Sequence, residues 1–317
     1  MIAQPLTRGH LIGKKGTFWP RKQFLLEIVH NPLRPLILLM ALAALAAAPL
    51  ATALEEGPVV RAMSYNIRLN IASDSAHAWP HRLDRVVSTI RFHEPDVIGL
   101  QEALLDQLED LETHLPDYSW IGVGREDGEA SGEFSAILFR EETLHAVDSG
   151  TFWLSEAPHV VGSVGWDAAL PRIVTWVRFE HRPSGRLLLH VNTHFDHVGA
   201  EARSKSAELV VRRARTLAEG QPVIVTGDVN SEPATPPYRH LASSFLDARE
   251  VSETPPHGPE GTFSGFVASD RPMPRIDYIF VSSGVRVLRF ATLAEHWNGK
   301  HGSDHLPVLA DLELRTD

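Results

Sequence analysis

The segment VIGLQE at residues 97–102 joins a short apolar run to a glutamate, and similar segments recur along the chain. Most of them place a polar residue at the end of an apolar run that is typical of a strand. The other five are SYNI at 64–67, NTH at 192–194, GDVN at 227–230, RIDYIF at 275–280 and GSDHLP at 302–307. This pattern predicts a β-scaffold that presents reactive side chains at its rim.

Strand-like runs alternate with amphipathic helical patterns through residues 58–317. We expect strands at 59–65, 97–100, 118–123, 134–140, 173–180, 186–193, 223–226, 276–282 and 307–313. We expect helices at 81–93, 103–115 and 200–218, and a long Pro-, Gly- and Ser-rich loop at 252–275. Some strands follow one another too closely for parallel crossovers, so the sheets should be mixed. The pattern predicts an α/β fold in which packed sheets have helices on their outer faces.

Composition and charge restrict the chemistry. The 317 residues are enough for one large core or at most two domains. There is no cysteine, which excludes disulfides, zinc–thiolate sites and cysteine nucleophiles, so a metal must bind through oxygen or imidazole. Residues 54–317 contain 24 Lys/Arg and 39 Asp/Glu. This acidic balance argues against avid binding to long nucleic acid, and we expect no stable partner of long duplex DNA.

The first 53 residues have the pattern of a targeting segment. Residues 36–54 have no charge and are mostly Leu and Ala, and the small-x-small pattern ATA stands at 51–53. This predicts a signal peptide that is cleaved after Ala53, with export to the periplasm or the medium. The alternative is an uncleaved membrane anchor formed by residues 36–54. In either case we expect residues 54–317 to form the working domain.

Glu102 and Asn66 each follow an expected strand. A carboxylate in this place suits a hard divalent cation such as Mg²⁺ or Mn²⁺. A neutral amide can orient a metal-bound phosphate or a carboxylate without adding charge. The alternative for Glu102 is the favourable N-terminus of the following helix, and the alternative for Asn66 is an Asx turn. We interpret both residues as part of a metal site.

Asp228 and Asn230 follow Gly227 and are two residues apart, so both side chains can lie on the same side. Asp228 is predicted to take a proton from an attacking water. Asn230 is predicted to donate a hydrogen bond to the charge that develops on a phosphate. Considered alone, the segment also fits an ordinary Gly-Asp turn.

His194 and His305 are predicted to contact the phosphate. Adjacent residues on an extended segment point in opposite directions, so Asp304 is expected to face a metal while His305 faces the scissile phosphate. Asp277 is predicted to orient His305 through one ring nitrogen and to support a positive ring. The alternative for Asp277 is an ion pair with Arg275.

Arg172 is predicted to bind phosphate through two guanidinium N–H groups. Arg125 and Glu133 are secondary candidates for the same region. His197 is a further candidate for a phosphate contact, whereas His190 lies in the middle of a strand and is expected to be structural.

Together these segments resemble the endonuclease/exonuclease/phosphatase superfamily over about residues 59–313. The resemblance implies a four-layer α/β sandwich with two central mixed β-sheets flanked by helices. It also implies a phosphoester hydrolase that uses Mg²⁺ or Mn²⁺, with Asp228 activating water and Glu102, Asn66 and Asp304 at the metal. The matching positions are Asn66, Glu102, His194, Asp228, Asn230, Asp277, Asp304 and His305.

The segments at 92–102, 192–197 and 275–280 are most similar to the deadenylase branch of that superfamily. This implies a phosphodiesterase, in particular a 3′–5′ exonuclease acting on single-stranded RNA or oligonucleotides. The alternative is an exported phosphatase or phospholipase-type enzyme acting on a lipid or sugar phosphate, because the site and its loops decide the substrate. A catalytically inactive binding module would lack a metal carboxylate or a general base, and neither is missing. We expect a monomer whose partner is its phosphoester substrate, an oligonucleotide or a small phosphorylated molecule.

Overall fold

The computed structural model describes residues 57–268 and 271–315. The expected leader, residues 1–53, lies outside these residues, so its nature as a signal peptide or an anchor and its boundary stay predictions. In the part of the chain that the structure describes, no helix combines the length and the apolar character needed to cross a membrane.

The first β-sheet has six strands in the order β11-β12-β1-β2-β4-β3. Its central strand β1 (Val59–Asn66) runs parallel to β2 (Val97–Gln101) and antiparallel to β12 (Val308–Leu314). The sheet is therefore mixed, as predicted. Its other strands are β3 (Tyr118–Ile121), β4 (Ile137–Arg140) and β11 (Val285–Thr292).

The second β-sheet also has six strands, in the order β5-β6-β7-β8-β10-β9. Strands β7 (Arg186–His194) and β8 (Val223–Asp228) are parallel, whereas the other pairs are antiparallel. This sheet is mixed as well. Its remaining strands are β5 (Leu144–Trp153), β6 (Ile173–His181), β9 (Leu246–Asp247) and β10 (Asp277–Val281).

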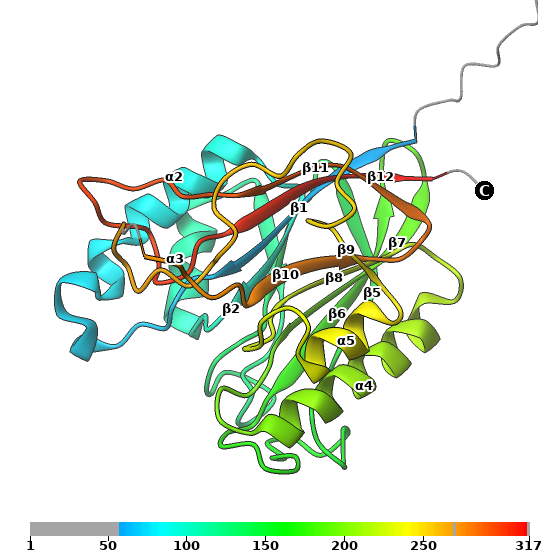
Figure 1. Cartoon of the computed structure of the whole chain (residues 1–317), viewed down its shortest axis with the longest axis horizontal. Coiled ribbons are helices and arrows are strands. Elements are labelled where there is room, and N and C mark those ends of the chain that lie inside the picture. The colour runs from blue at the N-terminus through cyan, green and yellow to red at the C-terminus, as the bar shows by residue number, and fades with distance from the viewer. Residues whose placement is uncertain (1–56, 269–270, 316–317) are drawn as a thin grey trace, which may run out of the picture. The chain divides into compact units, whose positions relative to one another are not determined.

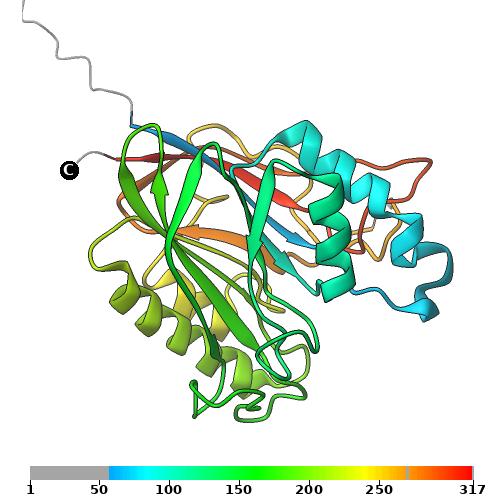
Figure 2. The ribbon, with the colours of Figure 1, turned by 180° about the vertical axis from the view of Figure 1, so that it is seen from behind.

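Helices cover the outer faces of the two sheets (Figures 1 and 2). Helices α2 (Leu83–His93) and α3 (Leu105–His114) pack on the first sheet, and α4 (Ala200–Ala218) and α5 (Pro236–Ala242) pack on the second. The layers run helix, sheet, sheet, helix, which confirms the predicted α/β sandwich. Two short 3₁₀ helices, η1 (Ala72–His77) and η2 (Trp79–His81), precede α2.

The alternation of side chains along each strand divides the apolar residues between an inner core and two outer cores. On β8, Ile224 lies in the core between the sheets, whereas Val223 and Val225 pack under α4. The same alternation continues to the end of the strand. It therefore turns Asp228 toward the space between the sheets.

A buried polar network joins the two sheets below their common edge. Asn192 on β7 donates from Nδ2 to the carbonyl oxygens of Leu100 (2.7 Å) and Ala136 (2.9 Å). Its Oδ1 accepts from Gln101 Nε2 (2.7 Å) and from the hydroxyl of Thr226 (3.0 Å). Because these groups are fully buried, the network fixes the relative position of the sheets where the polar segments begin.

Gly99 on β2 lies at this network, against Thr226 and Asn192 of the second sheet. A Cβ atom there would meet Thr226 Oγ1 at 2.0 Å and Asn192 Oδ1 at 2.4 Å. The absence of a side chain at residue 99 is therefore a condition for the packing of β2 against β7 and β8.

Candidate active site

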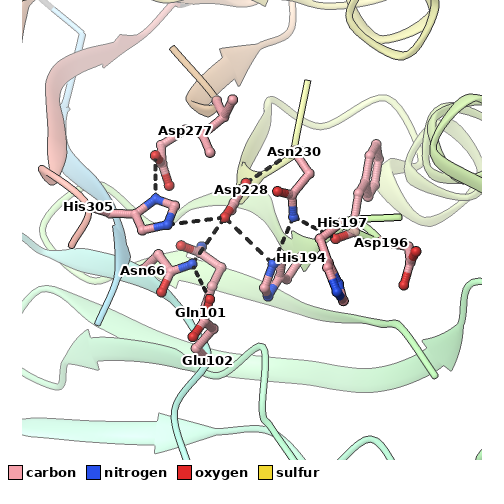
Figure 3. Close-up of polar contacts among 12 residues, drawn as sticks. Asn66, Gln101, Glu102, His194, Asp196, His197, Asp228, Asn230, Asp277 and His305 are labelled. Carbon is pink, nitrogen blue, oxygen red and sulfur yellow. Dashed lines mark hydrogen bonds and ion pairs between the residues drawn. The ribbon is translucent and has the colours of Figure 1, made fainter. Parts of the chain in front are cut away.

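Strand directions bring the predicted site residues to one edge of the sandwich. Asn66, His194 and Asp228 end β1, β7 and β8, and Glu102 directly follows β2. Asp277 begins β10, which is antiparallel to β8, and is the Cα partner of Asp228. Asp304 and His305 precede β12, which is antiparallel to β1. Figure 3 shows that Asn66, His194 and His305 approach Asp228 from both sheets.

His305 stands between two carboxylates. Its Nδ1 lies 2.9 Å from Asp277 Oδ2, and its Nε2 lies 3.7 Å from Asp228 Oδ2. Burial alone would lower the pKa of His305, but the charge and hydrogen bond of Asp277, with the charge of Asp228, outweigh burial and raise it to about 10. The ring is therefore protonated at neutral pH.

The alternative ion pair between Asp277 and Arg275 is wrong. Arg275 is buried and instead pairs with Asp247 and with Glu250 Oε1, the latter at 3.1 Å. Asp277 is thus left to His305, which is the geometry that the predicted orienting role requires.

Asp228 is a buried carboxyl whose pKa lies near neutrality. Burial and the charge of Asp277 raise the pKa of Asp228 to about 7. Its Oδ2 accepts from Asn66 Nδ2 at 3.0 Å, and its Oδ1 accepts from the backbone N–H of Asn230 at 2.9 Å. A carboxylate with such a pKa is suited to accept a proton from water at neutral pH.

His194 is neutral, and its tautomer follows from Asn230. The amide nitrogen of Asn230 lies 3.0 Å from the carbonyl oxygen of Phe195, to which it donates, and 3.1 Å from His194 Nε2. The Nε2 atom therefore accepts, and the ring proton is assigned to Nδ1, which lies 3.7 Å from Glu133 Oε2. Burial, with the charges of Arg172 and Arg125, lowers the pKa of His194 well below its usual value.

In this arrangement the side-chain amide of Asn230 donates both of its N–H groups to partners within the protein, His194 and Phe195. Its backbone has a positive φ of 47°, which Asn tolerates better than most residues, and this turn aims the amide at His194. The predicted contact between Asn230 and a phosphate stays a prediction.

Glu102 and Asp304 offer carboxylates to the same pocket. Helix α3 begins at Leu105, so Glu102 is not in its first turn, and the alternative role at the helix N-terminus is wrong. Glu102 Oε1 accepts from Asn66 Nδ2 at 3.0 Å. Burial raises the pKa of Asp304, and the charge of Glu102 raises it further against the opposing charge of His305.

This donor set fits a divalent cation. Two buried carboxylates that repel each other are stabilised by a hard ion bound through oxygen, as Mg²⁺ and Mn²⁺ are. Asn66 directs its amide N–H at Glu102 and Asp228 while its oxygen accepts from the N–H of Arg68. Asn66 is thus placed to orient carboxylates, and a direct metal contact would require its amide to turn over.

A second group of ligand atoms lies deeper in the site. One atom each of Asp228, Asp277 and His305 lies within 4.8 Å of the other two. However, His305 Nδ1 is already bonded to Asp277, and a protonated ring offers no lone pair to a metal. We therefore favour the pair Glu102 and Asp304 as the metal ligands.

Arg172 forms part of the pocket wall and is only 4% exposed. Its Nη2 lies 2.9 Å from His197 Nδ1, and its Nε lies 3.4 Å from Asp196 Oδ2. The Nη1 atom is buried without a hydrogen-bond partner. Arg125 lies beside it and pairs with Glu133 Oε2 at 2.7 Å. The closest charged partner of Arg172 Nη1 is Glu133 Oε2 at 4.0 Å. A buried N–H group without a hydrogen bond at a pocket wall suits an anionic ligand, and the predicted phosphate contact of Arg172 stays a prediction.

The pocket has a volume of about 380 Å³ and is lined by both charged and apolar side chains. Sequence reasoning missed five of the lining residues because four of them belong to loops without a motif, and the fifth, Ile276, was expected only as a strand residue of the RIDYIF segment. Arg68, only two residues after Asn66, is the one with a recognisable signal, and it lies 3.6 Å from Glu102 Oε2. The missed residues that line the pocket are Arg68, Leu69, Leu170, Phe263 and Ile276.

Comparisons with known proteins find one matching family and several similar structures. A model of the Endonuclease/Exonuclease/phosphatase family matches residues 63–305. A Bacteroides vulgatus endonuclease/exonuclease/phosphatase structure has a TM-score of 0.78 and 40% identity, covering 81% of this chain and 100% of that chain. A mannosyl-6-phosphatase of Bacteroides thetaiotaomicron has a TM-score of 0.77 and 38% identity, covering 80% of this chain and 99% of that chain.

A more distant similarity links the chain to Nocturnin of Drosophila melanogaster. The two sequences are 24% identical over 212 residues, which is 62% of this chain. The matched part is only 32% of Nocturnin, so the chain spans about a third of that curated relative.

Proposed function

Because the chain belongs to the endonuclease/exonuclease/phosphatase family and is a metal-dependent phosphoester hydrolase, we propose that it removes phosphate from a small phosphomonoester, in particular a sugar phosphate. The observation that carries this choice is the 38% identity with a mannosyl-6-phosphatase over nearly all of that chain. A pocket of about 380 Å³ is at the small end for ligand sites and suits one phosphorylated sugar. In this proposal the enzyme acts as a monomer.

Glu102 and Asp304 would hold Mg²⁺ or Mn²⁺, with Asn66 fixing the carboxylate of Glu102. When bound, the ion would supply positive charge that offsets the charge developing on the phosphate oxygens.

Asp228 acts as the general base. It takes a proton from a water molecule while the water oxygen bonds to phosphorus, and the ester oxygen leaves on the opposite side. Its hydrogen bonds from Asn66 and from the N–H of Asn230 hold both carboxylate oxygens in place for this transfer.

Two histidines and an arginine stabilise the charge on the phosphate oxygens. His305 is positively charged and donates from Nε2, the ring nitrogen that Asp277 leaves free. His194 donates from Nδ1, and Arg172 donates from Nη1, which has no hydrogen bond within the protein. Fixed donors in a buried site lower the barrier because they need no reorganisation during the reaction.

The second candidate function is 3′–5′ exonuclease activity on single-stranded RNA or oligonucleotides. The similarity to Nocturnin favours it, as does the deadenylase-like character of the segments at 92–102 and 275–280. The acidic balance of residues 54–317 speaks against long duplex DNA as a partner in either case.

Export is a separate part of the proposal. It rests on the uncharged stretch at 36–54 and on the ATA pattern at 51–53. The mass of the protein recovered from its producing cell tests this: a mature chain that begins at Leu54 supports cleavage, and a full-length chain in the membrane fraction supports the anchor.

Substrate choice is tested with purified protein in Mg²⁺ or Mn²⁺, with an EDTA control and an Asp228→Asn variant. The panel contains hexose 6-phosphates, lipid phosphates, bis-p-nitrophenyl phosphate, and 5′-labelled single-stranded RNA and DNA. Phosphate release from a sugar monoester, with the oligonucleotides intact, is the expected result. Stepwise shortening of RNA from its 3′ end, without turnover of monoesters, would replace the proposal by the second candidate.

A further inference from the structure

We propose that Thr262 is a positioning residue that sets the geometry of the Asp277–His305 pair. Thr262 is fully buried in the long segment between β9 and β10. Its Oγ1 accepts two backbone hydrogen bonds, from the N–H of Ile276 at 3.0 Å and from the N–H of Asp277 at 3.1 Å. The hydroxyl therefore holds the backbone of the residue that orients His305.

The backbone of the same residue is bonded to the segment that contains His305. The N–H of Leu306 donates to the carbonyl oxygen of Thr262 at 2.7 Å, and the N–H of Ser264 donates to that of Asp304 at 2.7 Å. On the other side, the N–H of Thr262 donates to the carbonyl oxygen of Pro274 at 2.9 Å. Residues 262–264 thus connect the entry to β10 with the entry to β12.

This connection matters because Asp277 and His305 belong to different layers. Asp277 begins a strand of the second sheet, and His305 precedes a strand of the first. Their bond of 2.9 Å therefore depends on how the two sheet edges are held relative to each other. Thr262 is bonded to both edges.

The carboxylate of Asp277 has little else to hold it. Its Oδ1 is buried without a hydrogen-bond partner, and its Oδ2 faces His305. The position of this side chain is thus set by its backbone, which the Thr262 hydroxyl fixes. The ring of Phe263 also packs edge-on against the imidazole of His305, with ring centroids 5.0 Å apart, so the same short segment limits the His305 ring.

The matched variants are Thr262→Val, which keeps the shape but removes the acceptor, and Thr262→Ser, which keeps the hydroxyl. Ser264→Ala is a control, because it removes a hydroxyl that donates to the carbonyl oxygen of Asp304 and does not touch Asp277. The first measurement is the NMR signal of the His305 Nδ1 proton in metal-free protein, identified by its absence in His305→Gln. We expect Thr262→Val to shift or lose this signal, and Thr262→Ser and Ser264→Ala to retain it.

The second measurement rests on the proposed function. For a phosphoester that the wild type hydrolyses, Thr262→Val should lower kcat by about 10- to 100-fold and change KM by less than about 2-fold. Misplacement of catalytic groups by about 1 Å has effects on kcat of that size. Thr262→Ser should restore kcat to within about 2-fold. A purely structural residue would instead change the melting temperature without this split between kcat and KM.

An unchanged Nδ1 signal in Thr262→Val would overturn the inference, whatever the activity. If no phosphoester is hydrolysed by the wild type, the proposed function fails, and the NMR signal still decides the role of Thr262. Should Thr262→Val not fold, Thr262→Ala removes the same acceptor without adding a methyl group in its place, and the same signal is measured.

Discussion

Asp228 and Asp277 are Cα partners across β8 and β10, so two buried carboxyl groups stand side by side on the inner face of one sheet. Asp277 is bonded to His305 Nδ1. Burial raises the pKa of Asp228, and the charge of the neighbouring Asp277 raises it further, to about 7. Because of the antiparallel register of β8 and β10, Asp277 lies beside the positive His305, and Asp228 can exchange a proton near neutral pH.

Replacement of Asp228 by Asn should strongly reduce turnover while the fold persists. The amide has the same shape but cannot take a proton, so we expect kcat to fall by about 10²- to 10⁴-fold. The melting temperature should stay equal or rise, because a buried carboxyl with a raised pKa is removed. Asp148→Asn on the exposed edge strand β5 is the control. Near-normal turnover of Asp228→Asn would exclude Asp228 as the base.

Replacement of Glu102 by Gln should weaken metal binding specifically. The loss of one of two carboxylates is expected to raise the Mn²⁺ concentration for half-saturation by at least about 10-fold, which corresponds to about 1.4 kcal/mol. Calorimetric titration of Mn²⁺, and the rise in melting temperature that Mn²⁺ produces, measure this without a substrate. An unchanged titration would remove Glu102 from the metal site.

Acid should destabilise the protein partly through His190. Burial lowers the pKa of His190 to about 3, whereas an exposed histidine has a pKa of about 6.5. Between these values the unfolded chain binds a proton that the folded chain does not, so the free energy of unfolding falls as the pH drops from about 6.5 toward 3. One such group contributes up to about 1.4 kcal/mol per pH unit.

The variant His190→Gln tests this pH dependence. It has no group that titrates in this range, and its amide can still reach the Thr226 hydroxyl that lies 2.9 Å from His190 Nε2. Urea unfolding between pH 7 and pH 4 should show a shallower loss of stability than in the wild type. His145→Gln, at an exposed position on β5, is the control. If the free energy of unfolding falls equally steeply with decreasing pH in the wild type and in His190→Gln, the assignment to His190 is contradicted.

Gly99→Ala should destabilise the sandwich. A methyl group at this position meets Thr226 and Asn192 at the contact between the sheets, and overpacking of this kind costs about 1–3 kcal/mol. Gly284→Ala is the matched control because nothing lies within 4 Å of a Cβ atom at that position. Urea unfolding compares the two, and an equal effect at both positions would refute the role of Gly99.

The central strands could be predicted from the sequence because they are buried on both faces, and their apolar runs are continuous. The edge strand β5 could not, since seven of its ten residues are exposed or half-buried and its Asp148-Ser149-Gly150 centre is typical of a turn. Strand β11 was also missed. A register shift between Val287 and Arg289 interrupts its alternation, so the period-2 pattern that Val285 and Val287 begin does not continue along the strand.

The polar side chains at the strand ends could be predicted because they follow apolar runs, and because the alternation of side chains along a strand decides which residues share a face. Their supporting residues could not be predicted. Thr262 and Phe263 lie in a loop whose path depends on bonds to segments about 12 to 44 residues away in the chain. The alternative for Asp277 was wrong for a similar reason, since Arg275 pairs with Asp247 on the two-residue strand β9, which has no sequence signature.

On β8, the residue that fills the inner core and the carboxyl at the strand end share the same parity, since Ile224 and Asp228 are four residues apart. A one-residue insertion between them would rotate Asp228 to the side of α4 or force Ile224 out of the core. Deletions of one residue would act in the same way. Either outcome destabilises the fold, because it buries the Asp228 carboxyl in the apolar core under α4 or removes Ile224 from the core between the sheets. The length of β8 is therefore constrained by folding as well as by the site at its end.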